Sequence, residues 1–295
     1  MSFFVEFFRL ITSVYVWLPT VLILVFLTWR NNRRIKEIEA VESSLLVIEI
    51  PKANDKSELA AEQLFASLHG ILRDRRELQK SGGIQEHLSF EVASVRGQIR
   101  FYAWVPKTLQ SFVGQIYSQY PSVQIHEADE DYVAHERHHS VVHTAEIELT
   151  DTQYLPIKTF QSFEVDPLAG ITGTLAKLEN TEEELWVQVL ARPIPDSWHK
   201  ESDKWIAAVK AGRLNPLSGF NASWLSSMFA ALWKPPELGD GDGGPEISER
   251  NKTRIAEAEK KAAKLGYQVK IRLAYLGEST ANARLRMQAI VGTFK

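Results

Sequence analysis

Residues 88–105 read LSFEVASVRGQIRFYAWV and predict a β-hairpin. Leu88–Ala93 and Gln98–Val105 alternate as strands do, and Arg96-Gly97 between them occupies the place of a tight turn. A helical apolar pattern and an outer strand flank this hairpin on each side, which gives the order β-α-β-β-α-β of a ferredoxin-like split motif. The flanking elements are the strands Leu45–Ile50 and Val123–Ile125 and the helical patterns Leu59–Leu72 and Leu109–Tyr117.

The same order of elements begins again after a connector, but the sixth strand of this second repeat is missing. A repeat short of one strand exposes unpaired backbone groups, so we expect the natural polypeptide to continue beyond Lys295. The alternative is a genuinely five-element second domain. The predicted elements of the second repeat are the strands Thr144–Leu149, Leu185–Leu190 and Tyr267–Tyr275, a helix begun by Asp166-Pro167, and a last helix capped by Ser279 or Thr280.

The predicted fold class is therefore α+β: one N-terminal transmembrane helix followed by two tandem ferredoxin-like repeats. The second repeat has a long insertion and lacks its last strand. The predicted parts are an anchor with its basic flank (1–36), a first repeat (43–128), a connector rich in histidine and acidic residues (129–143), and a second repeat (144–295) with an insertion at about 193–264.

The anchor is predicted from a run of 20 residues, Leu10–Trp29, that contains no charge. A helix of this length spans a bilayer core, tolerates Pro19, and places Trp29 where an interfacial aromatic belongs. Basic residues stay on the cytoplasmic side, so we expect a single-pass inner-membrane protein with its N-terminus outside. A cleaved signal peptide and a buried core helix are the alternatives. The residues that carry the prediction are Leu10, Trp17, Pro19, Phe26, Trp29, Arg30, Arg33 and Arg34, with Lys36 beyond them.

Composition excludes several classes of function. The chain of 295 residues has no cysteine, which excludes disulfides, thiolate metal sites and cysteine nucleophiles. Its formal net charge is −3, so it has no global attraction for nucleic acid and we expect no direct binding. The sequence also has neither a phosphate-binding G-x-x-x-x-G-K-[ST] loop nor a G-x-S-x-G elbow, and we assign no catalytic residue and no cofactor.

The insertion contains a segment without charge between Arg213 and Lys234. This segment would lie on the membrane as an interfacial helix or pack against its own domain, and the sequence does not separate the two. Its large apolar residues are Trp224, Leu225, Met228, Phe229 and Trp233.

Residues 135–139 match the zinc-binding pattern H-E-x-x-H. On a helix, His135 and His139 would bind zinc and Glu136 would act as general base. The pattern fixes only three residues in a stretch that also holds His138 and His143, and it falls in the connector between the repeats. We therefore predict a solvated connector and no metal site; a zinc hydrolase with His143 or Glu164 as third ligand is the alternative.

Strand alternation also predicts which side chains lie on the uncovered face of the sheet. Arg100, Tyr102 and Trp104 should lie there, as should Lys270 and Arg272. Aromatic residues on such a face are typical of RNA-recognition modules. Because the first strand has no aromatic partner, we favour packing of the face with Arg100, Tyr102 and Trp104 on the second repeat or on another subunit. For Lys270 and Arg272 we favour an ordinary solvated face.

Four segments resemble a known family: residues 60–70 (AAEQLFASLHG), 112–121 (FVGQIYSQYP), 154–160 (YLPIKTF) and 163–168 (FEVDPL). They are similar to the membrane-anchored N-terminal region, an uncharacterised domain, of type IV secretion and conjugative-transfer-like ATPases from candidate-phyla bacteria. These ATPases belong to the FtsK–HerA superfamily of translocation motors.

The resemblance implies an anchoring and assembly region that precedes a motor domain absent from this chain. The implied partners are the lipid bilayer, further copies of the chain, and a downstream motor or secretion-system proteins. ATP hydrolysis would reside in that motor, so the resemblance assigns no enzymatic activity here. A stand-alone membrane-bound adaptor is the main alternative; a zinc hydrolase and an RNA-binding module are weaker ones.

Overall fold

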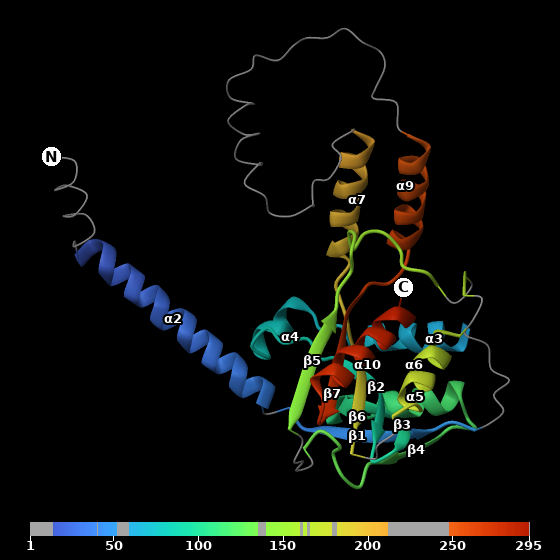
Figure 1. Ribbon diagram of the computed structural model, residues 1–295. Helices are drawn as coiled ribbons and strands as arrows, with labels where there is room; N and C mark the ends of the chain where they lie inside the picture. Colours follow the sequence, from blue (N-terminus) through green and yellow to red (C-terminus); the bar gives the residue numbers. More distant parts are fainter. Residues whose placement is uncertain are drawn as a thin grey trace, which may run out of the picture.

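The computed structural model describes residues 14–39, 41–51, 59–134, 140–159, 162–163, 166–178, 182–211 and 248–294. The fold is α+β, as predicted, with one seven-stranded antiparallel sheet and eight α-helices in this part of the chain (Figure 1). The strand order is β4-β1-β3-β2-β6-β7-β5. The two predicted repeats therefore share one continuous sheet.

The first four strands lie where the sequence predicted them. β1 (Ser43–Glu49) has β3 (Gln98–Pro106) on one side and the edge strand β4 (Gln124–Glu127) on the other. β2 (Leu88–Val95) pairs with β3 through the predicted hairpin. Arg96 and Gly97 have φ angles of 51° and 75°, the left-handed pair that a two-residue type I′ turn requires.

The remaining strands continue the sheet from β2. β6 (Glu184–Pro193) pairs with β2 from Leu88↔Ala191 to Ser94↔Leu185, and β7 (Tyr267–Gly277) pairs with β6. β5 (Val141–Ile147) pairs with β7 at the end of the sheet. We call the β2–β6 pairing the seam, because it joins the two halves of the sequence.

Helices cover one face of the sheet. α3 (Leu59–Leu68) and α5 (Ser111–Gln119) pack on the first half, where Leu68, Leu88 and Val105 are buried. α6 (Pro167–Leu175) and α10 (Thr280–Thr293) cover the second half, where Leu175, Leu185 and Ile290 are buried.

The predicted caps start the last two of these helices. The Asp166 carboxylate accepts a hydrogen bond from the backbone N–H of Leu168 at 2.9 Å, and Ser279 Oγ accepts one from Asn282 at 3.4 Å. Side-chain oxygens at these positions satisfy N–H groups that have no partner within the helix. The sequence therefore fixes where these helices begin.

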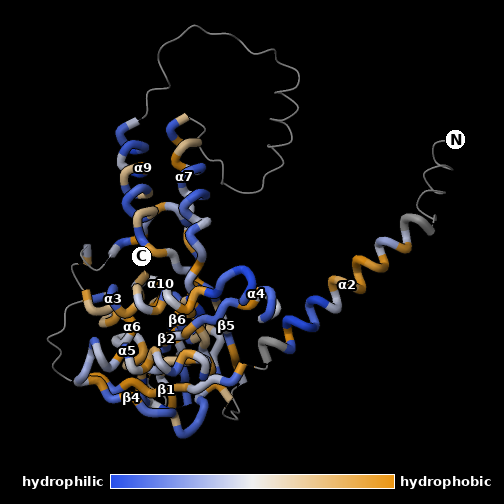
Figure 2. The backbone as a smooth tube through the Cα atoms, turned by 180° about the vertical axis from the view of Figure 1, so that it is seen from behind, coloured by the Kyte–Doolittle hydropathy of each residue, from blue (hydrophilic) through white to orange (hydrophobic). Residues whose placement is uncertain are grey.

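Two helices of the predicted insertion project from the sheet side by side (Figures 1 and 2). α7 (Ser197–Lys210) follows β6 and α9 (Glu249–Ala262) precedes β7. Trp205, Ile206 and Ile255 bury their shared face together with Tyr154. Residues 212–247, between the two helices, lie outside the described residues.

A short helix, α4 (Arg75–Lys80), was not predicted. Asp74 accepts a hydrogen bond from the N–H of Glu77 at 2.7 Å, and the Glu77 carboxylate accepts one from the N–H of Asp74 at 2.9 Å. This reciprocal capping box is a sequence signal that would have revealed the helix. Two 3₁₀ turns, η1 (His69–Ile71) and η2 (Lys107–Leu109), complete the described elements.

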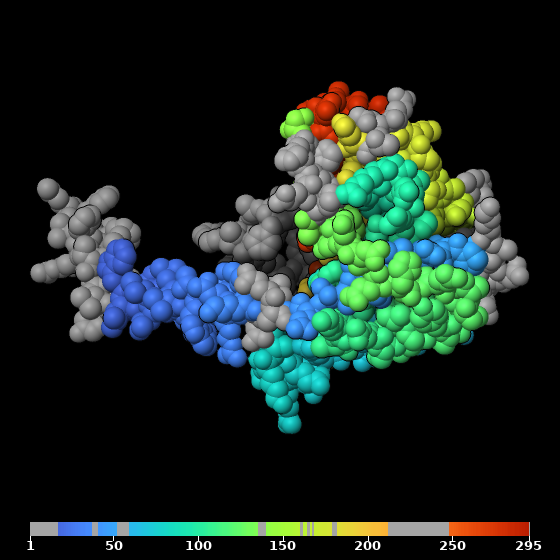
Figure 3. Space-filling model, turned by 90° about the horizontal axis from the view of Figure 1, so that it is seen from below, coloured from blue at the N-terminus to red at the C-terminus, as the bar shows by residue number. Residues whose placement is uncertain are grey.

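The N-terminal helix α2 (Val14–Glu39) stands away from the folded body (Figures 1 and 3). None of the helices in the described residues combines the length and the apolar run that a membrane crossing requires. The spanning helix predicted over Leu10–Trp29 is therefore not found in that part of the chain. Leu10 itself lies outside the described residues.

Candidate functional site

The first candidate surface is the apolar part of α2. Ten large apolar side chains between Trp17 and Trp29 are 42–60% exposed. Most of this part of α2 is coloured as hydrophobic in Figure 2. Soluble monomers rarely expose a contiguous apolar patch of this kind, which marks a membrane or protein contact. The residues are Trp17, Leu18, Val21, Leu22, Ile23, Leu24, Val25, Phe26, Leu27 and Trp29.

Basic side chains follow this apolar stretch within two helical turns. Arg30, Arg33, Arg34 and Lys36 are all exposed. The Arg33 guanidinium lies 5.9 Å from the centre of the Trp29 ring, a cation–π contact. Trp29, Arg33 and Lys36 line a shallow hollow of about 510 Å³ on this helix. The surface of α2 therefore changes from apolar to cationic at the Trp29 ring.

The second surface is the sheet face opposite the four covering helices, which we call the open face. It carries Tyr102 and Trp104 of β3, as the alternation predicted, while Ala103 and Val105 pack toward the helices. Lys270 and Arg272 of β7 also lie on the open face, where both pair with Glu146 of β5.

Tyr132 covers the middle of the open face. Its ring stacks on Tyr102 at 4.8 Å and meets Trp186 edge-on at 5.0 Å. Its hydroxyl donates a hydrogen bond to the buried carboxylate of Glu91 and accepts one from Gln188 at 3.0 Å. Burial, then the Glu91 carboxylate, raises the pKa of Tyr132, so the phenol stays protonated. One residue of the predicted connector thus contacts both halves of the sheet across the seam.

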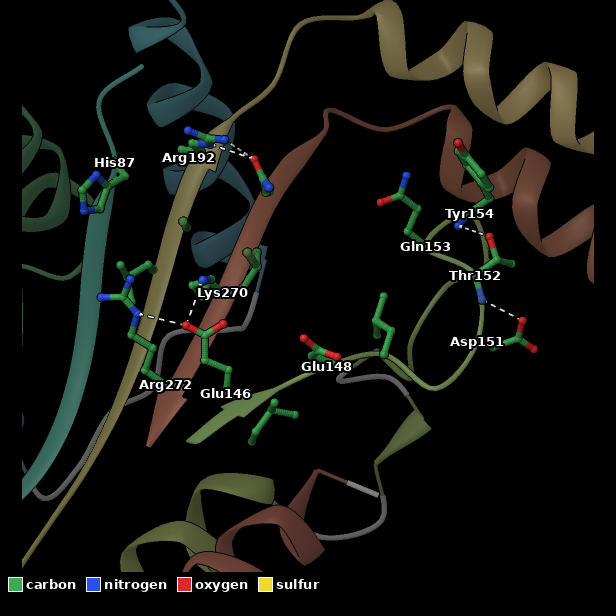
Figure 4. Close-up of a pocket in the computed structure, with 16 residues that line it drawn as sticks. His87, Glu146, Glu148, Asp151, Thr152, Gln153, Tyr154, Arg192, Lys270 and Arg272 are labelled. Atoms are coloured by element: carbon green, nitrogen blue, oxygen red, sulfur yellow. Dashed lines mark hydrogen bonds and ion pairs between the residues drawn. The ribbon is translucent and has the colours of Figure 1, made fainter. Parts of the chain in front are cut away.

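Beyond Tyr132, a cleft of about 860 Å³ lies between the open face and residues 148–154, which we call the strap (Figure 4). Arg192 of β6 and Lys270 and Arg272 of β7 form the sheet wall. Arg192 donates to the Gln268 amide oxygen from Nε at 2.8 Å and from Nη2 at 2.5 Å. Lys270 donates to Glu146 at 2.8 Å, and Arg272 lies 3.7 Å from the same carboxylate.

The strap is held in place by α9 and α7. Arg254 pairs with Asp151 at 2.8 Å, and Lys261 Nζ donates to the carbonyl oxygens of Gln153 at 2.7 Å and Leu155 at 3.0 Å. The Tyr154 ring stacks on Trp205 at 6.0 Å in the buried base of the helix pair. The second wall of the cleft is therefore preformed.

His87 closes one end of the cleft and stacks on Trp104 at 4.9 Å. Burial lowers the pKa of His87, and the positive charges of Arg192 and Arg272 lower it further. The ring is therefore neutral at neutral pH, with one nitrogen able to donate a hydrogen bond to a ligand and the other able to accept one from it. The contributions of Arg192 and Arg272 place two positive charges close to this end of the cleft.

Several predicted site residues lie outside the described residues and stay predictions. They are Leu10, the interfacial segment with Trp224, Leu225, Met228, Phe229 and Trp233, and the motif residues His135, Glu136, His138 and His139. His143 lies on β5, opposite Tyr275 of β7. Within the described residues, no group of three or more histidine and acidic side chains could hold a metal ion.

Sequence reasoning missed the cleft. Lys270 and Arg272 were placed on the open face, and the same period of two extends that face to Arg192 on β6. The alternation along β6 and β7, however, does not reveal that the strap, which is distant from both strands in sequence, lies over these cations. The contact of Tyr132 with Glu91 was missed for the same reason, because it joins residues 41 positions apart.

The fold and these surfaces define an α+β domain preceded by an exposed apolar helix. The chain belongs to the family described as a domain of unknown function, DUF8128, whose model matches residues 27–295. The match begins within α2, two residues before Trp29, and includes the basic turns. It shows no link to secretion ATPases. No curated protein matches the chain.

Proposed function

We propose that this chain is the membrane-anchoring and docking region of a type IV secretion or conjugation-like translocation ATPase whose motor domain lies outside it. The exposed apolar side chains of α2 carry the proposal. Burying a side chain of this kind contributes about 1.5–3 kcal/mol, so a bare apolar helix beside a well-packed domain favours transfer to an apolar phase. The proposed anchor, Leu10–Trp29, begins ahead of the described part of α2.

The strand order supports a finer interpretation of the fold. The order β4-β1-β3-β2 of the first half is that of a ferredoxin-like repeat. Read from the opposite edge of the sheet, β5-β7-β6 has the same order of first, third and second strand, without a fourth strand. We interpret the sheet as two such repeats joined edge to edge at the seam. Their helices then lie on one side, which leaves for docking the part of the open face that Tyr132 does not cover, including the cleft under the strap.

The proposed arrangement is an inner-membrane protein with the sheet in the cytoplasm. The cationic residues directly after Trp29 support this orientation, because basic residues are retained on the cytoplasmic side. Further copies of the chain and the motor or other secretion proteins would be the partners of the docking surfaces.

Membrane fractionation of the native host tests the anchor. Replacing Leu18, Leu22 and Leu24 by glutamine should release the full chain into the soluble fraction, because three exposed apolar side chains are lost from α2. The matched control replaces Leu59, Leu149 and Leu285, which are 55%, 58% and 63% exposed on the folded body. Release by both triple variants, or by neither, contradicts an anchor in α2.

A stand-alone membrane-bound adaptor is the second candidate, and the preformed cleft favours it because a binding site needs no motor in the same polypeptide. Reading the native locus beyond codon 295 separates the two candidates. A frame that continues into a G-x-x-x-x-G-K-[ST] loop supports the motor assignment. A stop codon, with an endogenous mass near 33.5 kDa, supports the adaptor.

A further inference from the structure

We propose that the cleft between the open face and the strap binds an extended peptide segment of a partner protein, with carboxylates at alternate positions. The proposal deepens the docking function, and it does not depend on the membrane anchor. A cleft of about 860 Å³ with fixed walls lies within the range of sites that bind small ligands and short peptide segments.

The charges on the sheet wall favour an anionic occupant. The sheet wall carries three cations, Arg192, Lys270 and Arg272, and one carboxylate, that of Glu146, which pairs with Lys270 and Arg272. Arg192 donates its hydrogen bonds to an uncharged amide, so its positive charge is not neutralised by that contact. On the strap, Asp151 is already paired with Arg254. The sheet wall therefore has an excess of positive charge, in agreement with its effect on His87.

The spacing of the cations favours an extended chain. Lys270 and Arg272 are two residues apart on β7, which corresponds to about 6.6–6.8 Å along a strand. An extended peptide has the same repeat, so its side chains at alternate positions can meet successive cations. Planar guanidinium groups such as that of Arg272 bind carboxylates through two parallel hydrogen bonds.

The acidic residue Glu148 on the strap favours a peptide over a nucleic acid. Its side chain also lines the cleft. A phosphate backbone carries a negative charge at every nucleotide and would be repelled there. A peptide can place a neutral or basic residue beside Glu148 and still offer carboxylates to the sheet wall.

Fluorescence anisotropy of the full chain in mild detergent tests the proposal, with a labelled peptide of alternating glutamate and serine as probe. The Arg192→Gln and Arg272→Gln variants should each weaken binding about three- to fivefold, and the double variant about tenfold, as expected for partly exposed ion pairs. Arg284→Gln is the matched control, because Arg284 is exposed on α10, which covers the opposite face.

Three outcomes overturn the proposal: no binding of the glutamate peptide, equal weakening by Arg284→Gln, or binding of a lysine–serine peptide with the same affinity. Binding of a single-stranded oligonucleotide more tightly than the glutamate peptide would assign the cleft to nucleic acid instead. Loss of peptide binding in a chain that still fractionates with membranes separates failure of the cleft proposal from failure of the anchor.

Discussion

At the scale of single residues, the Tyr132 hydroxyl donates a hydrogen bond to the buried carboxylate of Glu91. Glu91 is 6% exposed and accepts hydrogen bonds from Tyr132 and from Gln188, the latter at 3.3 Å. Tyr132→Phe should lower the free energy of unfolding by about 1–3 kcal/mol, because a buried acceptor loses its hydroxyl donor while the ring contacts stay. Urea denaturation followed by circular dichroism measures the change.

Tyr154→Phe is the control for this prediction. The Tyr154 hydroxyl lies 3.4 Å from the carboxylate of Glu201, an exposed residue that water can solvate. We expect a change within about 0.5 kcal/mol, the range of surface substitutions. Equal effects of the two variants would mean that Glu91 does not depend on the Tyr132 hydroxyl.

The raised pKa of the buried Tyr275 phenol predicts that the folded chain loses stability at alkaline pH. Burial, and then its hydrogen bond to Glu183, raises the pKa of Tyr275 to about 12, from an ordinary value of 10.0. The unfolded chain loses this proton first, so the stability contributed by the neutral phenol is complete below pH 10 and is lost as pH rises toward 12.

Urea titrations between pH 8 and 12 measure this dependence. The raised pKa values of Tyr102, Tyr132 and Tyr267 add to the same slope. Tyr275→Phe should therefore reduce the alkaline slope of the unfolding free energy by about one proton without abolishing it. An unchanged slope would show that Tyr275 ionises as freely in the folded chain as in the unfolded one.

At the scale of single elements, the basic end of α2 predicts a preference for anionic membranes. Each Lys or Arg close to an anionic surface contributes about 1 kcal/mol. Replacing Arg30, Arg33, Arg34 and Lys36 by glutamine should therefore remove most of the gain in vesicle binding that phosphatidylglycerol gives over phosphatidylcholine. Binding to purely zwitterionic vesicles should persist, because the apolar stretch is unchanged.

Vesicle flotation at two salt concentrations checks this prediction. The control variant replaces four exposed lysines of α7 and α9, namely Lys200, Lys204, Lys252 and Lys260, and has the same net charge. A loss of anionic preference in both variants would assign the effect to overall charge rather than to α2. Salt should weaken the lipid-dependent part in the wild type and leave the apolar part unchanged.

Elements were predictable where local chemistry decides them. Arg96-Gly97 fixed the hairpin and Asp166-Pro167 fixed the start of α6, because turn and cap geometry depend on a few adjacent residues. β5 was predicted from Thr144 but begins at Val141. Strand ends depend on pairing, here with Gly277 on β7, and so cannot be located from local sequence alone.

At the scale of the whole molecule, the seam was beyond sequence reasoning. The sequence predicted two repeats, one after the other along the chain. It did not predict that β2 of the first repeat pairs with β6 of the second, with Leu88 opposite Ala191. The same limit applies to the cleft, whose walls come from β6, β7 and the strap. Contacts between residues distant in sequence determine the seam and the cleft. Hydrophobic periodicity and capping residues indicate only contacts between residues close in sequence.

The seam predicts that the two halves unfold as one unit. Leu185 is fully buried on β6 in the core of the second half, and its strand pairs directly with β2 of the first. Leu185→Ala should cost about 2–5 kcal/mol. Because the sheet is continuous, the slowest-exchanging backbone amides of β1 and β3 should lose as much protection as those of β7.

Native-state hydrogen exchange by mass spectrometry reports on peptides from both halves in a single experiment. The exposed Leu285→Ala variant, on α10, should leave protection unchanged in both. If Leu185→Ala lowered protection only in β5, β6 and β7, the seam would be a contact between two independently stable domains. Equal loss across β1 to β7 would instead mean that a partner docked on either half stabilises the whole sheet, because ligand binding to one part of a cooperative unit is shared by all of it.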